Sequence, residues 1–380
     1  MFQDPRLATT QRLQQPPAGC VSCLAAEARL VDAISTRRLV AFARLRSVLL
    51  AVLALLKRSC WADQRQIPGT GNKSTMLYAD SIRLSLATGD EVQAFVRAEP
   101  PSSHKKCLLL HGNPATILDW KQVIPLLPSI VDIAAIDLPG FGRSPRISSN
   151  PECVSLDPFA DCSIAVADAL SWTEPFFIVG HSHGGGVAQV TAARYPERVA
   201  GIVLISTLSA RKHGSYRFLS LPLAETALRL AGHILRSTVL RPLGKSIMRR
   251  VMKGIWSPEP VPGERFEREL ALFSSRSEVL VSMVHVAKGR PCQYLARTVP
   301  RIRCPVLVIH GELDALVPLE YARSLHERIV NAKGQSELRI LPGAGHAVLD
   351  YQTAEVADCI TQFLSRHEFQ NDGCPTHACT

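Results

Sequence analysis

The sequence predicts an α/β fold with a mostly parallel central sheet flanked by helices, and three observations support it. Short apolar runs rich in β-branched and aromatic residues recur along the chain, as at 175–179, 202–205 and 305–309, and such runs are typical of strands buried on both faces. Segments with helical spacing of apolar residues separate these runs, as in βαβ units. The 380-residue chain is 46% apolar and 20% charged, which indicates a globular protein.

The predicted elements follow one another in a simple order. Residues 80–98 alternate apolar and polar around Thr88-Gly89-Asp90, which predicts an opening hairpin. Strands and helices then alternate to about residue 208, and the alternation resumes at about residue 304. A final helix is predicted at about 346–369, because apolar residues recur there at helical spacing: Val348, Val356, Ile360 and Phe363.

A serine lies at the end of one predicted strand. The run 175–179 leads into Gly180-His181-Ser182-His183-Gly184, and a helix is predicted to follow at about 183–195. Gly-x-Ser-x-Gly between a strand and a helix is the nucleophile-elbow pattern, which holds the serine hydroxyl clear of the backbone on a strained turn. The glycines are needed because that turn leaves little room for neighbouring side chains.

A base and an acid follow this serine in the chain. His346 comes after the predicted strand 338–342, and Asp314 comes after the strand 305–309. All three residues therefore lie after carboxyl ends of strands, where open parallel sheets place their sites. A serine needs a base to take its proton and a third group to orient that base. Glu312 is a second carboxylate in the acid loop.

Together with 108–114 (Leu-Leu-Leu-His-Gly-Asn-Pro) and 136–144 (Ile-Asp-Leu-Pro-Gly-Phe-Gly-Arg-Ser), these motifs resemble the α/β-hydrolase fold serine hydrolases, with an esterase- or lipase-like character. The resemblance covers about residues 80–369. It implies the α/β-hydrolase fold with a helical cap insertion, and a catalytic triad of Ser182, Asp314 and His346. Asp314 is favoured over Glu312 as the acid because Gly311, Asp314 and Val317-Pro318 fit the family pattern Gly-x-x-Asp-x-x-Val-Pro. It also implies an oxyanion hole formed by the backbone N–H groups of Asn113 and His183. We expect the side chain of His111 to shape its loop.

The resemblance implies hydrolysis of carboxylic esters, with an apolar acyl or alcohol group, through an acyl-enzyme. Amide, thioester and lactone hydrolysis and perhydrolysis use the same groups and stay open. A binding scaffold without catalysis on the same fold is an alternative of a different class. The His-Gly-Asn-Pro loop also resembles haloalkane dehalogenases. Those enzymes use an aspartate followed by tryptophan, whereas this chain has Ser182 and His183. No cofactor and no metal are expected.

The catalytic domain is predicted to be split into 76–208 and 304–369, with a helical cap at 209–303 between its parts. Helices are expected near 224–231, 243–252 and 264–273, broken by prolines at 258, 260 and 262. Between residues 209 and 258 the chain has ten Lys and Arg residues but one acid, Glu225. Basic amphipathic helices indicate an anionic membrane surface or an acidic substrate. A solvated positive face over an apolar substrate tunnel remains the alternative. We expect no nucleic-acid partner, since no recognition module accompanies the charge.

Residues 1–75 are predicted to be an N-terminal extension, and 370–380 a C-terminal tail. The extension begins with a Gln- and Pro-rich stretch, and an apolar helix flanked by basic residues is expected at 39–56. We favour membrane association through this helix. The alternatives are that it packs on the catalytic domain and that the protein is cytoplasmic. The odd count of eleven cysteines, with Cys107, Cys304 and Cys359 in predicted elements, favours reduced thiols.

Overall fold

The computed structural model describes most of the chain between residues 76 and 367. The described ranges are 76–98, 105–146, 155–211, 219–221, 223–276, 278–332 and 334–367. All of them belong to one compact unit. The predicted extension at 1–75, including the helix at 39–56, and the predicted tail at 370–380 lie outside the described residues.

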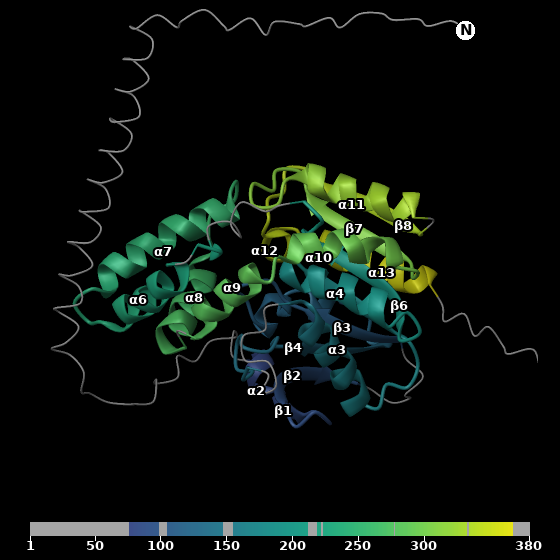
Figure 1. The fold of residues 1–380 in the computed structure, drawn as a ribbon, viewed down its shortest axis with the longest axis horizontal. Helices are drawn as coiled ribbons and strands as arrows, with labels where there is room; N and C mark the ends of the chain where they lie inside the picture. The colour runs from purple at the N-terminus through teal and green to yellow at the C-terminus, as the bar shows by residue number, and fades with distance from the viewer. Residues whose placement is uncertain are drawn as a thin grey trace, which may run out of the picture. The chain divides into compact units, whose positions relative to one another are not determined.

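Within the described residues, the centre of the fold is an eight-stranded sheet in the order β1-β2-β4-β3-β5-β6-β7-β8 (Figure 1). The strands are β1 (Ser81–Ser85), β2 (Glu91–Arg97), β3 (Lys105–Leu110), β4 (Val131–Ile136), β5 (Phe176–His181), β6 (Val199–Ile205), β7 (Val306–Gly311) and β8 (Ser336–Leu341). Strands β3 to β8 pair in parallel, whereas β2 pairs antiparallel with both β1 and β4. The predicted mostly parallel α/β sheet is confirmed.

The predicted hairpin at 80–98 is formed by β1 and β2, with Ser85 opposite Glu91. The N–H of Leu86 donates to the carbonyl of Asp90 at 2.8 Å and closes the turn. Gly89 in this turn has φ +83°, a left-handed conformation that costs glycine little. The residues of the turn itself therefore explain why β1 and β2 form a hairpin.

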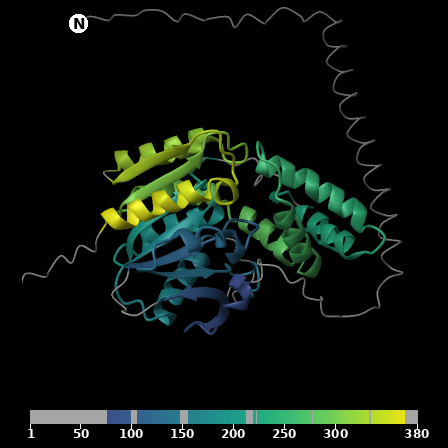
Figure 2. The ribbon, with the colours of Figure 1, turned by 180° about the vertical axis from the view of Figure 1, so that it is seen from behind.

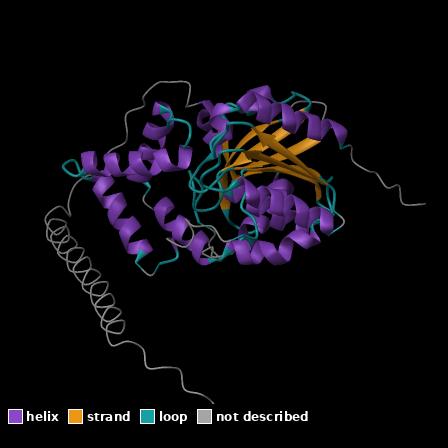
Figure 3. Cartoon of the chain, turned by 90° about the horizontal axis from the view of Figure 1, so that it is seen from above, coloured by secondary structure: helices purple, strands orange, loops and turns teal. Residues whose placement is uncertain are grey.

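Helices cover both faces of the sheet (Figure 3). They are α2 (Met76–Ala79), α3 (Asp157–Ala169), α4 (His183–Arg194), α10 (Pro291–Thr298), α11 (Leu319–Asn331), α12 (Val348–Tyr351) and α13 (Thr353–Arg366), with the 3-10 helices η2 (Ile117–Trp120), η3 (Ile124–Leu126) and η4 (Val299–Arg301). Helix α4 packs on β5 and β6, and α3 and α10 pack on α4. Helix α13 packs on β7, and its buried side chains share a core with η2 and η3.

Each parallel strand sends alternate side chains into two hydrophobic cores. In β3, Leu108 and Leu110 enter the core on the α4 side, while Cys107 and Leu109 enter the core on the α13 side. All four side chains are fully buried. Burial on both faces explains the uninterrupted apolar runs of the sequence. Because each buried leucine contributes about 1.5–3 kcal/mol, the cores fix the strand ends on which the site is built.

The predicted helical insertion contains α6 (Ala224–Arg236), α7 (Arg241–Trp256), α8 (Gly263–Ser275) and α9 (Glu278–Lys288). These four inserted helices pack around α6 and lie to one side of the sheet (Figures 1 and 2). The predicted prolines separate α7 from α8. Among the described helices, no single one is long and apolar enough to cross a membrane, although α8 and α9 meet that test as a pair bent by 92°.

The C-terminal region differs from the single helix predicted at 346–369. It forms two helices, α12 and α13, with Gln352 between them in a non-helical conformation (φ −114°, ψ 38°). His346 precedes α12 and lies in a loop. The predicted apolar positions are all buried, so the spacing was informative: Val348, Val356, Ile360 and Phe363. The break itself carries no glycine or proline that could have revealed it.

Three cysteines expected to be reduced are free thiols, namely Cys107, Cys304 and Cys359. Burial raises the pKa of Cys107 and of Cys304 to about 12, so both thiols are protonated at neutral pH. Cys304 lies just before β7 and not within it. These thiols therefore contribute packing and no nucleophile.

Candidate active site

Ser182 lies on a strained turn between β5 and α4. Its backbone has φ +51° and ψ −109°, a conformation that costs a non-glycine residue about 1–3 kcal/mol. The Ser182 N–H donates to the carbonyl of Ile205 at 2.8 Å, and the Ser182 carbonyl accepts from the N–H of Leu208 at 3.2 Å. The end of β6 and the residues after it therefore hold the serine in this conformation.

The glycines around Ser182 allow three backbone segments to approach closely. A Cβ at Gly180 would lie 2.4 Å from the carbonyl oxygen of Gly184. A Cβ at Gly184 would lie 2.3 Å from the carbonyl oxygen of Leu110, the last residue of β3. No side chain fits at these distances. The two glycines of the Gly-x-Ser-x-Gly pattern are therefore required by contacts of the turn with itself and with β3.

Ser182 also lies where the strand order of the sheet changes direction. The chain leaves β3 for β4 on one side and then returns to β5 on the other side, which opens a crevice at the carboxyl ends of β3 and β5. The loop after β3 carries Gly112 and Asn113, and a Cβ at Gly112 would lie 3.3 Å from the Cβ of Ser182. Asn113 and Ser182 line the same cavity. The structure thus brings the predicted oxyanion loop against the predicted nucleophile.

Asp314 and His346 come together from the loops after β7 and β8. Asp314 Oδ2 lies 2.8 Å from His346 Nδ1. An ionised carboxylate only accepts hydrogen bonds, so Nδ1 carries the proton and Nε2 is the basic nitrogen of the neutral ring. The N–H groups of Leu316 and Val317 donate to Asp314 Oδ1 at 2.9 and 2.8 Å. Burial pushes the pKa of Asp314 upward, but the interactions with His346 and these donors outweigh it, and the pKa lies below its ordinary value.

The other acidic candidate, Glu312, is exposed and does not contact His346. Its Oε2 accepts the N–H of Gly343 at 2.9 Å. His310 donates from Nε2 to the carbonyl of Val317 at 2.8 Å, so it braces the acid loop. Of the two carboxylates in this loop, the structure brings Asp314 to the histidine.

His181 is a positioning residue that sequence reasoning missed. Its ring centroid lies 5.1 Å from that of His346, and its Nε2 lies 3.3 Å from the His346 carbonyl oxygen. Burial, together with the nearby His346, lowers the pKa of His181 to about 3, so the ring is neutral and donates this hydrogen bond. His181 therefore fixes the backbone of His346 without competing for its proton.

The loop after β3 is held by the side chain of His111. Its Nε2 accepts the N–H of Leu138 at 2.9 Å, and its Nδ1 donates to the carbonyl of Gly112 at 2.7 Å. The loop after β4 is organised by Asp137, whose oxygens accept the N–H groups of Ile117 (2.8 Å) and Arg143 (2.7 Å). Both side chains are fully buried and bind backbone groups, which agrees with the loop-shaping role expected for His111.

The side chain of His183 is packed away in the core. Its ring meets Phe159 in an edge-on contact with centroids 5.3 Å apart, and neither ring nitrogen has a hydrogen-bond partner among the described residues. Burial, aided by the nearby His111, lowers the pKa of His183 to about 3. The ring is therefore neutral and apolar in behaviour, so any contribution of His183 to catalysis comes from its backbone N–H.

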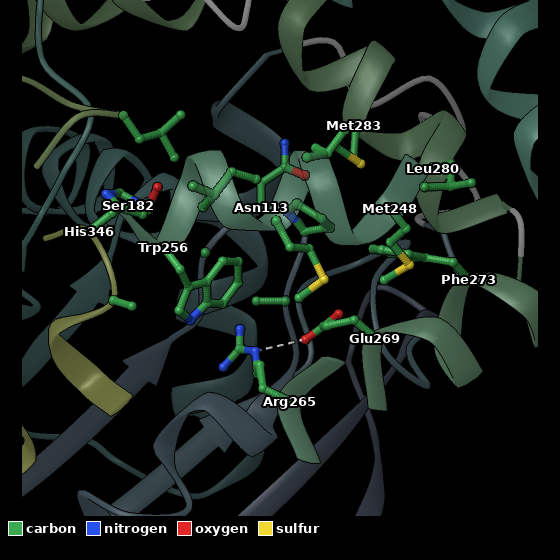
Figure 4. Close-up of a pocket in the computed structure, with 18 of the residues that line it drawn as sticks. Asn113, Ser182, Met248, Trp256, Arg265, Glu269, Phe273, Leu280, Met283 and His346 are labelled. Carbon is green, nitrogen blue, oxygen red and sulfur yellow. Dashed lines mark ion pairs between the residues drawn. The ribbon is translucent and has the colours of Figure 1, made fainter. Parts of the chain in front are cut away.

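A cavity of about 280 Å³ opens in front of Ser182. Ser182 and His346 lie at one end of it, and Met248, Phe273 and Leu280 lie at the other (Figure 4). Most of its wall is aliphatic or aromatic and comes from the four inserted helices. Such a wall binds an apolar group by removing it from water.

One part of this wall is charged. The guanidinium of Arg265 lies 2.6 Å from Asp119, 3.0 Å from Glu269 and 3.8 Å from Asp350. Arg268 lies 3.3 Å from Asp119 and 3.5 Å from Glu269. We call these five residues the buried ion cluster, and it joins α8 to η2 and α12. Arg265 and Glu269 lie four residues apart in one helix, a spacing at which the sequence predicts an ion pair. Their partners Asp119 and Asp350 lie in distant segments, and no local sequence pattern predicts those contacts.

No group of three or more His, Cys, Asp or Glu side chains within the described ranges could hold a metal ion.

Known proteins resemble this chain in sequence and in fold. Residues 108–353 match the model of the alpha/beta hydrolase fold family. The pimeloyl-[acyl-carrier protein] methyl ester esterase of Neisseria meningitidis is 28% identical over 251 residues, which cover 66% of this chain and 89% of that relative. A monoacylglycerol lipase of Bos taurus is 22% identical over 279 residues, covering 70% and 77% of the two chains.

A solved structure of a thermophilic esterase from Thermogutta terrifontis shares the fold, with a TM-score of 0.57 and 24% identity, covering 76% of this chain and 99% of that one. The family match spans more than half of the sequence and includes the strands and loops that carry the site. The chain therefore belongs to the α/β-hydrolase fold family.

Proposed function

We propose that this protein is a serine hydrolase that cleaves carboxylic esters with an apolar acyl or alcohol group. The observation that supports this most is the hydrogen bond between Asp314 and His346, made beside the cavity that Ser182 lines. A scaffold that only binds ligands needs neither a strained serine nor an oriented histidine at the same place. Their coincidence favours catalysis over the binding-scaffold alternative.

The first half of the proposed reaction forms an acyl-enzyme. His346 Nε2 takes the proton of the Ser182 hydroxyl as its oxygen attacks the ester carbonyl, and Asp314 stabilises the resulting imidazolium. The backbone N–H groups of Asn113 and His183 hold the oxyanion of the tetrahedral intermediate. When this intermediate collapses, the proton on His346 passes to the leaving alcohol oxygen. In the second half, His346 takes a proton from water as the water oxygen attacks the acyl carbonyl. The bond between the acyl carbon and the Ser182 oxygen then breaks, the proton on His346 returns to that oxygen, and the carboxylic acid is released.

Two features support an apolar ester as the substrate. The cavity wall is mostly aliphatic and aromatic, and each buried CH₂ group of a ligand contributes about 0.8 kcal/mol. The relatives named above include a methyl ester esterase and a monoacylglycerol lipase. Amide, thioester and lactone hydrolysis and perhydrolysis would use the same three residues, so they are the alternatives that a substrate comparison must test.

We also infer that the protein works at an anionic membrane surface. On α7, Leu243, Ile247 and Val251 recur every four residues and are 57%, 54% and 58% exposed. Ile247 and Val251 also line the cavity, so this exposed apolar stripe adjoins the space that Ser182 faces. Burying the stripe in a lipid surface would place the cavity beside the membrane from which an apolar ester would enter it.

The charge of the same helix supports an anionic surface. Helix α7 contains no acidic residue and five basic ones: Arg241, Lys245, Arg249, Arg250 and Lys253. Each basic residue near an anionic leaflet adds about 1 kcal/mol of binding free energy. The helix expected at 39–56, outside the described residues, would supply a second apolar contact.

A substrate comparison tests the proposed reaction. We expect kcat/KM to rise from p-nitrophenyl acetate to the octanoate, by about threefold to fourfold per added CH₂ while the chain stays inside the cavity. The octanoyl amide of p-nitroaniline should react more slowly than the octanoyl ester. A flat or falling series would contradict the apolar binding role of the cavity, and faster cleavage of the amide would favour the amidase alternative.

A further inference from the structure

The buried ion cluster presents an unsatisfied acceptor at the cavity. Glu269 is 3% exposed and lines the cavity. Its Oε1 pairs with Arg265 at 3.0 Å and Arg268 at 3.5 Å. Its Oε2 is buried and has no hydrogen-bond partner among the residues that the structure describes. Buried polar atoms in native proteins are nearly always paired, so this atom indicates a place for a ligand group.

The charges of the cluster restrict what that group can be. Three carboxylates (Asp119, Glu269 and Asp350) face two guanidinium groups, which leaves one negative charge in excess when all are ionised. Burial raises the pKa of Glu269, which favours proton uptake and relieves this excess. A hydroxyl group both donates and accepts, so it can pair with the carboxylate and with the carboxylic acid. An ammonium group can pair only with the carboxylate.

The buried ion cluster is connected to the segment that carries His346 through Asp350. In the proposed mechanism His346 passes its proton to the leaving oxygen, so the alcohol part must lie beside His346. Asp350 lies in α12, four residues after His346, and accepts the indole N–H of Trp256 at 3.3 Å. The guanidinium of Arg265 lies over the Trp256 ring, 5.3 Å from its centroid. Figure 4 shows Trp256 between His346 and the Arg265–Glu269 pair.

We propose that Glu269 Oε2 hydrogen-bonds a hydroxyl group on the alcohol part of the substrate, so that the enzyme prefers esters of polyhydric alcohols over esters of simple alcohols. This inference rests on the proposed ester hydrolysis and names its alcohol. The apolar end of the cavity then receives the acyl chain. An ester of an apolar acid and a glycerol-like alcohol can place its acyl chain at the apolar end of the cavity and a hydroxyl group at Glu269 Oε2.

The experiment compares 1-octanoylglycerol with propyl octanoate, which have the same acyl group and alcohols of the same carbon skeleton. We expect the wild type to hydrolyse the glyceryl ester with a kcat/KM about tenfold to a hundredfold higher, as a hydrogen bond to a charged group allows. Glu269→Met, which removes both oxygens at similar size, should reduce the ratio of the two kcat/KM values to about one. Glu267→Met is the matched control, because Glu267 lies on the same helix, is 57% exposed and pairs with Lys245 at 2.6 Å.

A purely structural role of Glu269 gives a different result. If Glu269→Met slows both esters equally and the preference remains, the cluster only joins α8 to the rest of the domain and the proposal is wrong. Equal hydrolysis of the two esters by the wild type would overturn it as well, whatever the stability of the variant.

Failure of the proposed function can be recognised separately. If neither ester is hydrolysed, that function fails, and binding of two stable ethers decides the present inference. Calorimetry should then show tighter binding of 1-O-octylglycerol than of octyl propyl ether to the wild type, with the difference lost in Glu269→Met. Equal affinities in the wild type would refute the hydroxyl site.

Discussion

Asp314 Oδ2 and His346 Nδ1 lie 2.8 Å apart although the two residues belong to loops after different strands. Parallel pairing of β7 and β8 places Gly311 opposite Leu341, so both strands end at the same edge of the sheet. Asp314 follows the first strand by three residues, and His346 follows the second by five. The register of two strands therefore sets the distance on which the proposed chemistry depends.

Asp314→Asn should reduce kcat by about four orders of magnitude, because an amide in this position favours the wrong imidazole tautomer. Glu312→Gln is the matched control, since Glu312 lies in the same loop and binds the Gly343 N–H. It should retain most of the activity. Steady-state kinetics on p-nitrophenyl octanoate measure both variants, and the reverse ranking would show that the acid has been wrongly assigned.

His183 should make the protein less stable in mild acid. Its pKa is near 6.5 in the unfolded chain and about 3 when folded, so the unfolded state binds more protons between these values. The contribution of the neutral His183 ring to the free energy of unfolding is therefore complete above pH 6.5, and it is lost as the pH falls below 6.5. From pH 8 to pH 5 the wild type should lose about 2 kcal/mol more than His183→Met, which keeps an apolar side chain and the backbone N–H.

Urea unfolding of both proteins at the two pH values measures this difference. His367→Gln serves as the control, because His367 is only partly buried. It should follow the wild type much more closely than His183→Met does. Equal pH dependence of the wild type and His183→Met would mean that the folded protein accommodates the charged ring.

The exposed stripe of α7 should bind anionic vesicles in a salt-sensitive manner. The full chain should cosediment with phosphatidylglycerol-containing vesicles at low salt and be released at high salt, because surface charges are screened within about 8 Å at physiological ionic strength. Leu243→Asp should weaken binding without affecting hydrolysis of a soluble short-chain ester. Val330→Asp is the control: Val330 is 47% exposed but lies on α11.

A chain that starts at Thr75 separates the contribution of the predicted helix at 39–56. We expect it to stay folded and active on a soluble ester and to bind vesicles less tightly than the full chain. If the full chain ignores anionic vesicles at low salt, the membrane proposal is wrong. An insoluble shortened chain would instead support packing of that helix on the catalytic domain.

The parts of this fold that sequence predicts well are those with local causes. The Thr88-Gly89-Asp90 turn specifies its hairpin by turn chemistry, and the apolar run before Ser182 specifies a strand buried on both faces. The Gly-x-Ser-x-Gly pattern is readable because each glycine avoids a particular backbone clash. The triad could be proposed because the family resemblance implies it and each member follows a recognisable strand.

The parts that sequence does not predict depend on contacts between distant segments. Arg265 and Glu269 share one helix, but their partners Asp119 and Asp350 come from either side of the insertion. The break at Gln352 lacks a helix-breaking residue. His181 was passed over because its role, a hydrogen bond to the backbone of His346, exists only once the loop after β8 has folded over β5.

Labelling with a fluorophosphonate tests the central claim, the activation of Ser182, most directly. The wild type should be labelled at one site, Ser182→Ala should not be labelled, and His346→Ala should react far more slowly. Ser206→Ala is the matched control, because Ser206 also follows a strand with a positive φ of 43° but is fully buried. It should be labelled like the wild type. Equal labelling of the wild type and Ser182→Ala would contradict the account.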